Sequence, residues 1–165
     1  MKKRVLSFLF IITLFSLTAV SASAVVNDTL KVGIRWGDTA LEAANLENAV
    51  GSGYEFGYYD EDREFVYLDE TDETTITMQA SGSGNDVTVT ETRSGEVLFQ
   101  FRDNGYCLGI RPMGRHTETW CKGYKYGGGF RYERIDGGDL TVVNILDLET
   151  YIKGVIPYEM NNAWP

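Results

Sequence analysis

The sequence is poor in the residues that most often build catalytic and metal sites. It has one histidine, two cysteines and three prolines among 165 residues. His116 has no serine or cysteine nucleophile in an interpretable relation to it, so a catalytic triad is not supported. His116, Cys107 and Cys121 do not follow any familiar zinc spacing. We therefore predict no metal site and no cofactor.

Positive charge is also scarce. The chain has 15 basic and 24 acidic residues, for a net charge of −9, and three of the basic residues fall within the first four positions. This balance argues against nucleic acid or anionic lipid as the main partner, because both attract basic surfaces.

Residues 1–24 have the pattern of a signal peptide. Lys2, Lys3 and Arg4 precede an apolar stretch over residues 5–20, and Ala22-Ser23-Ala24 forms an A-x-A cleavage site. We expect a secreted or extracytoplasmic protein, in the cell wall or on the outer face of the membrane. An uncleaved segment is the alternative, and it would be the only membrane attachment.

The cysteine pair can be interpreted in two ways. In an exported chain, Cys107 and Cys121 are expected to form a disulfide that closes a short loop. Two free thiols are the alternative.

Residues 25–135 are predicted to form a strand-rich α+β domain. A partial apolar stripe of Leu41, Ala44 and Leu46, stopped by a glycine-rich turn, predicts one short helix over residues 38–50. Turn-forming residues at 60–63, 93–95 and 136–139 predict hairpins. Alternating patterns predict strands over residues 29–36, 54–59, 64–68, 74–79, 86–92, 96–102, 106–110, 130–135 and 140–146.

The acidic stretch over residues 60–73 lacks the D-x-D-x-D-G spacing and distal glutamate of a calcium loop. We interpret it as a solvated hairpin edge protected by charge. Aromatic residues alternate along residues 54–67, so about half are expected to face a core. A glycan-binding platform is the less favoured interpretation of these aromatics.

The last predicted helix begins at Asp147, which is a suitable N-cap, and Glu149 lies in its first turn. Pro157 is expected to end or kink this helix near Val155 or Ile156. Its apolar positions have the spacing of a stripe that faces a core: Leu148, Tyr151, Ile152 and Val155.

The C-terminal segment LTVVNILDLETYIKGVIPYEMNNAWP resembles the opening of the catalytic domain in the stage II sporulation protein D family (SpoIID/LytB, amidase enhancer). The resemblance implies that residues 136–165 are the truncated start of such a domain, because the helix and cleft residues that follow W-P in the family are not present here. The matching positions are Val143-Asn144-Ile145-Leu146, Leu148-Glu149, Tyr151-Ile152, Gly154-Val155-Ile156, Glu159-Met160 and Trp164-Pro165.

The resemblance further implies a lytic transglycosylase that cleaves peptidoglycan glycan strands, with Glu159 as the catalytic acid/base. Ordinary glycosidases need two carboxylates. In a lytic transglycosylase one suffices, because the substrate's own 6-hydroxyl attacks the anomeric carbon. Glu159 must start protonated, which requires apolar neighbours such as Ile156, Met160 and Trp164. The alternative is a non-catalytic cell-wall-binding or amidase-enhancing module, with a cell-wall amidase as a partner.

Overall fold

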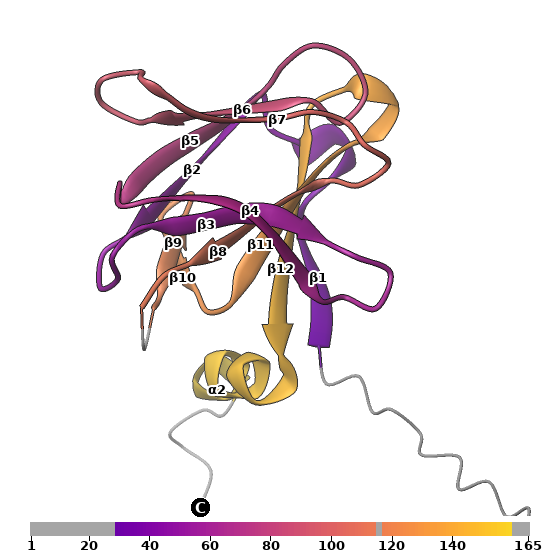
Figure 1. The fold of residues 1–165 in the computed structure, drawn as a ribbon. Coiled ribbons are helices and arrows are strands. Elements are labelled where there is room, and N and C mark those ends of the chain that lie inside the picture. The colour runs from indigo at the N-terminus through magenta and orange to yellow at the C-terminus, as the bar shows by residue number, and fades with distance from the viewer. Residues whose placement is uncertain (1–28, 115–116, 160–165) are drawn as a thin grey trace, which may run out of the picture.

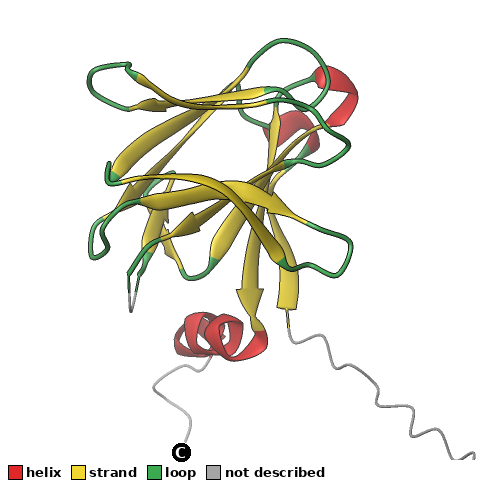
Figure 2. Ribbon diagram, viewed as in Figure 1, coloured by secondary structure: helices red, strands yellow, loops and turns green. Residues whose placement is uncertain are grey.

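A computed structural model describes residues 29–114 and 117–159, with side chains through residue 155. These residues form a β-sandwich, in which two antiparallel six-stranded sheets pack face to face around one core (Figures 1 and 2). Sheet A contains, in spatial order, β1 (Thr29–Arg35), β12 (Leu140–Asp147), β11 (Gly129–Arg134), β8 (Leu108–Pro112), β3 (Tyr54–Tyr59) and β4 (Phe65–Thr71). Sheet B contains β10 (Tyr124–Tyr126), β9 (Thr119–Cys121), β2 (Ala43–Asn48), β5 (Thr75–Ala80), β6 (Val87–Glu91) and β7 (Val97–Phe101).

The core follows from the alternation of side chains along the strands. In β5, Ile76 and Met78 are fully buried while Gln79 faces solvent. Between the sheets, the ring of Phe56 in β3 stacks on that of Phe99 in β7, with centroids 5.0 Å apart. Apolar side chains from both sheets thus form one continuous cluster.

Strand β12 is part of this sandwich. It pairs with β1 on one side and β11 on the other, and all its residues from Leu140 to Leu146 are buried. The predicted domain boundary between residues 135 and 136 falls in η2 (Ile135–Gly137), which connects β11 to β12. The boundary therefore runs through a single sheet.

The predicted α+β class is wrong, because the described chain is mostly β, with α2 (Leu148–Glu159) as its one α-helix. The helix expected over residues 38–50 is replaced by the 3-10 turn η1 (Gly37–Thr39) and by β2. Ala44, Leu46 and Asn48 are buried and alternate with exposed residues. This period of two allows β2 to pair with β5 and β9, and it overrides the partial helical stripe.

The remaining strand predictions are confirmed with shifted ends, whereas β9 and β10 were not predicted. These two short strands flank a turn at Lys122 and Gly123, whose φ angles are 50° and 85°. A two-residue turn with glycine at its second position is a hairpin signal that could have been found in the sequence.

The predicted turns are also confirmed. At the β11–β12 connection, Asp136 and Gly137 have φ angles of 53° and 71°. The side chain of Arg134 donates hydrogen bonds to the Gly138 carbonyl and to the carbonyls of Ser81 and Asp86 beside sheet B. Arg134 therefore joins this turn to the opposite sheet.

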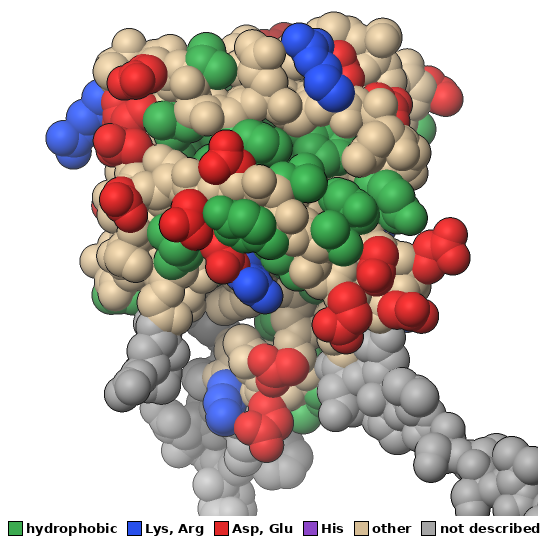
Figure 3. Space-filling model, viewed as in Figure 1, with side chains coloured by type: hydrophobic (Ala, Val, Ile, Leu, Met, Phe, Trp, Pro, Cys, Tyr) green, Lys and Arg blue, Asp and Glu red, His purple; other side chains and the backbone are tan. Residues whose placement is uncertain are grey.

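The acidic stretch forms the exposed β3–β4 hairpin at the edge of sheet A, as predicted. Figure 3 shows a group of carboxylates at the turn of this hairpin, on the right of the view. Cys107 and Cys121 are free thiols, so the predicted disulfide is wrong for this structure.

Candidate functional site

A buried asparagine near the end of β12, Asn144, anchors the glycine-rich turn that precedes β11. Asn144 is 3% exposed, and its Nδ2 donates hydrogen bonds to the carbonyls of Gly127, at 2.9 Å, and Gly129, at 2.8 Å. Gly128 has a φ of +78°, and a Cβ there would collide with the carbonyl of Ile145. Residues 127–129 therefore form a turn, which Asn144 fixes against β12.

Helix α2 begins directly after β12. The predicted cap is confirmed, because Asp147 Oδ1 accepts a hydrogen bond of 2.8 Å from the Thr150 amide and Oδ2 one of 2.6 Å from its hydroxyl. These bonds lower the pKa of Asp147. Figures 1 and 2 show α2 across the end of the sandwich at which β12 finishes.

Two expectations about this helix are wrong. The helix continues through Pro157 to Glu159, so the proline lies in its last turn and does not end it near Val155. The apolar stripe is not buried in a core. Leu148, Tyr151 and Ile152 are 45%, 36% and 41% exposed. Val155, the last position of the stripe, is half-buried. Helical spacing identified the stripe, but the described residues leave its other three side chains largely exposed.

A cavity of about 660 Å³ lies between α2 and the sandwich, and we call it the α2 cavity. Tyr151, Gly154 and Val155 form its helical wall, and Asn144 and Leu146 of β12 form part of the opposite wall. The rest of the lining is Val32, Trp120, Gly123, Tyr124, Lys125, Tyr126, Gly127 and Thr150.

Aromatic side chains dominate one side of the α2 cavity. Trp120, Tyr124 and Tyr126 come from β9 and β10, and the Nζ of Lys125 lies 5.4 Å from the Trp120 ring centroid. Flat aromatic faces with polar edges suit sugar rings, which have apolar faces and hydroxyl rims. Sequence reasoning missed these residues because it did not recognise the β9–β10 hairpin.

Glu159 is the last residue of α2. Helical positions 151 and 155 line the α2 cavity, and position 159 follows them at the i+4 spacing that repeats one face of a helix. The backbone therefore places residue 159 on the helical face that borders the cavity. The side chain of Glu159, like those of Ile156, Met160 and Trp164, lies outside the described part of the chain.

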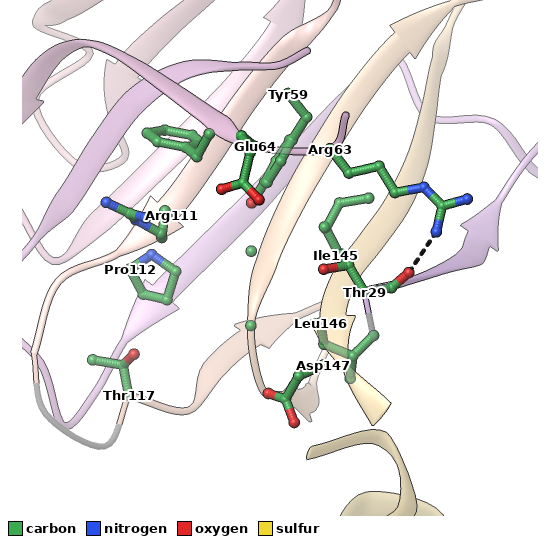
Figure 4. Close-up of a pocket in the computed structure, with 13 residues that line it drawn as sticks. Thr29, Tyr59, Arg63, Glu64, Arg111, Pro112, Thr117, Ile145, Leu146 and Asp147 are labelled. Atoms are coloured by element: carbon green, nitrogen blue, oxygen red, sulfur yellow. Dashed lines mark hydrogen bonds between the residues drawn. The ribbon is translucent and has the colours of Figure 1, made fainter. Parts of the chain in front are cut away.

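A second cavity, of about 370 Å³, opens on the outer face of sheet A, and we call it the Arg111 cavity. Figure 4 shows Glu64 and Arg111 on one side of this cavity and Asp147 on the other. The floor includes Gly129, where a Cβ would collide with the hydroxyl of Tyr59. Leu146 lines both cavities, so they adjoin at the end of β12.

Comparison with protein families identifies the segment that contains β12 and α2. Residues 136–165 match the family model described as Stage II sporulation protein, SpoIID. The C-terminal segment is SpoIID-like. No curated protein and no solved structure matches the chain.

The SpoIID segment therefore supplies Asn144, the N-cap of α2 and the helical wall of the α2 cavity, whereas the aromatic wall lies outside it. Among the described side chains, no cluster of three or more His, Cys, Asp or Glu could hold a metal ion. His116 lies outside the described residues. Within residues 29–114 and 117–159, no helix has the length and apolar character needed to span a bilayer.

Proposed function

We propose that the chain is an extracytoplasmic peptidoglycan-processing protein of the SpoIID type, in which the α2 cavity receives a glycan strand and Glu159 is the acid/base. The observation that carries the proposal is the position of the SpoIID segment. Its helix borders an aromatic-lined cavity, and the helical register brings residue 159 to the same face as Tyr151 and Val155.

The proposed reaction cleaves a glycosidic bond without water. Glu159 gives its proton to the oxygen of the leaving sugar as the bond from that oxygen to the anomeric carbon breaks. The 6-hydroxyl of the sugar that carries this anomeric carbon attacks it and closes the 1,6-anhydro ring, and the proton of that hydroxyl passes to the Glu159 carboxylate. The products are a free glycan end and a 1,6-anhydro sugar, and the glutamate is protonated again for the next cycle.

The test uses a chain extended by the catalytic sequence that follows W-P in SpoIID proteins. Glu159→Gln keeps the shape of the side chain but removes the proton, so release of 1,6-anhydro muropeptides from purified peptidoglycan should fall about 10²- to 10⁴-fold. Glu149→Gln is the matched control, because Glu149 is an exposed residue of the same helix that is paired only with Lys153 within the described chain. Equal activity of Glu159→Gln and Glu149→Gln would rule out Glu159 as the acid/base.

A non-catalytic wall-binding module is the second candidate. It is favoured by the aromatic wall of the α2 cavity, because the residues of this wall could bind a glycan with no catalytic role for Glu159. In this case the 165-residue chain should sediment with insoluble peptidoglycan, and Trp120→Ala should weaken the association. Binding that is retained in Glu159→Gln but lost in Trp120→Ala, with no anhydro product from any form, would favour this candidate.

A further inference from the structure

The outer face of sheet B carries almost no charge. Its strands β2, β5, β6 and β7 contain only two charged residues, Glu47 and Glu91, and Glu91 is 9% exposed. By contrast, charged residues make up 24% of the whole chain. Along β2, β5 and β6, buried residues alternate with residues that face outward. The outward side chains are mostly neutral and polar, and we call the following six the polar face: Asn45, Thr77, Gln79, Thr88, Thr90 and Gln100.

Strand pairing arranges the polar face in rows that cross the strands. In one row Asn45 lies opposite Thr77, and Thr77 lies opposite Thr90. In the next row Gln79 lies opposite Thr88. Neighbouring strands are about 4.8 Å apart, which is close to the length of one hexose in a β-1,4-linked glycan. A glycan that crosses the strands can therefore place one sugar over each strand.

Several groups of the polar face have hydrogen-bonding capacity left for a ligand. The side-chain amides of Asn45 and Gln79 are exposed and form no hydrogen bond with any described residue. The hydroxyls of Thr77 and Thr92 share one hydrogen bond of 3.0 Å, so the hydroxyl that accepts it keeps its own proton. Sugar hydroxyls and acetamido groups are neutral, and both kinds of group donate and accept hydrogen bonds. They therefore match the chemistry of this face.

The outer face of sheet B is continuous with the α2 cavity through Trp120. In the pairing of β9 with β2, Trp120 lies opposite the exposed Glu47, which places its side chain on the outer side of sheet B. The same residue lines the α2 cavity. Figure 1 shows sheet B extending from β9 and β10, close to α2, to β6 and β7 at the far end of the sandwich. A ligand strand that leaves the cavity past Trp120 therefore meets the polar face.

We propose that the polar face binds the part of a β-1,4-linked hexosamine glycan that extends beyond the α2 cavity. The glycan crosses β2, β5 and β6, and its hydroxyl and acetamido groups bond the amides of Asn45 and Gln79 and the threonine hydroxyls. A polyanion would meet no cation on the polar face, and a polycation would meet only Glu47 beside it. The assignment of this glycan to the cell wall rests on the proposed function.

The experiment is calorimetric titration of the 165-residue chain with β-1,4-linked oligomers of N-acetylglucosamine. A disaccharide occupies only the α2 cavity, whereas a hexasaccharide also reaches over the polar face. The hexasaccharide should bind roughly tenfold to hundredfold more tightly than the disaccharide, as expected for a few additional neutral hydrogen bonds.

A double variant with Asn45→Ala and Gln79→Ala should remove most of this difference and leave binding of the disaccharide unchanged. Both side chains are exposed and bond no described residue, so thermal unfolding of the double variant should match that of the native chain. Thr77→Val is a second variant, because it keeps the shape of the side chain and removes only the hydroxyl. It should also weaken the hexasaccharide alone. Lys31→Ala is the control, because Lys31 is an exposed strand residue of sheet A.

The outcomes separate this proposal from the proposed function. Equal binding of the two oligomers overturns the role of the polar face and leaves the α2 cavity standing as a glycan site. Binding of the hexasaccharide that is lost in the double variant but kept in Trp120→Ala supports the polar face and refutes the α2 cavity as a glycan site. Absence of binding by both oligomers overturns both proposals. A loss in Lys31→Ala equal to that in the double variant overturns the assignment to this face.

Discussion

Replacing Asn144 should destabilise the protein far more than an ordinary strand substitution. Asn144→Ala removes two hydrogen bonds from a buried site and leaves the carbonyls of Gly127 and Gly129 without their donor. Two such losses cost about 2–3 kcal/mol of the free energy of unfolding, which lowers the Tm of a chain of this size by roughly 4–12 °C. Urea titration and calorimetry measure the two quantities.

Asn144→Asp makes this test sharper. The aspartate has nearly the same shape, but it puts an oxygen where the Nδ2 donor points at two carbonyl oxygens. If Asn144 stabilises the fold by donating hydrogen bonds from Nδ2, the aspartate variant should lose at least as much stability as the alanine variant.

Asn45→Ala is the control for both variants, because Asn45 is exposed in β2 and should change stability by no more than about 0.5 kcal/mol. Asn144→Asp within 0.5 kcal/mol of the native protein would refute the argument, since it would mean that Asn144 only fills space.

Glu91 accepts hydrogen bonds from the amides of Ser94 and Arg93, which lower its pKa from 4.5 to about 2. A lowered folded-state pKa stabilises the protein above pH 4.5, and this contribution is lost as the pH falls towards 2, so Glu91→Gln should flatten the acid side of a stability–pH curve. An unchanged curve would contradict this role. Burial raises the pKa of Cys107 to about 11, so its alkylation at pH 8 should be slow in the folded protein. Both cysteines should react with the alkylating reagent after unfolding without reductant. Absence of labelling would show instead that Cys107 and Cys121 form the predicted disulfide. A chain ending at residue 139 lacks β12 and should be unfolded by circular dichroism, because β1 and β11 lose their shared partner. A cooperative unfolding transition of that chain would instead support the predicted domain 25–135.

Local patterns predicted the parts of this fold that depend on local interactions. The hairpins at residues 60–63 and 93–95 have strands and turn side by side in the sequence, and they form as expected. The cap at Asp147 depends only on Thr150, three residues away. The pairing of β1 with β12 joins residues more than a hundred positions apart, so no window of sequence contains its signal.

The errors have identifiable physical causes. The apolar pattern over residues 43–48 is too short to distinguish a helix from a strand. The segment forms a strand because it pairs with β5 on one side and β9 on the other. The stripe on α2 was recognised by its spacing, but burial depends on what lies opposite the helix. At the candidate site, the family motif directed attention to Glu159, whereas the aromatic wall and Arg111 became visible only when distant strands were brought together.

The position of β12 limits how this protein can recombine with others. The SpoIID segment begins within the sandwich and passes from β12 into α2 with no linker between Asp147 and Leu148. A gene fusion that moves residues 136–165 elsewhere would remove a buried strand from one protein and transfer it without its neighbours to another. Exchange of SpoIID segments between such proteins therefore requires a crossover after β12, or transfer of the whole sandwich together with its helix.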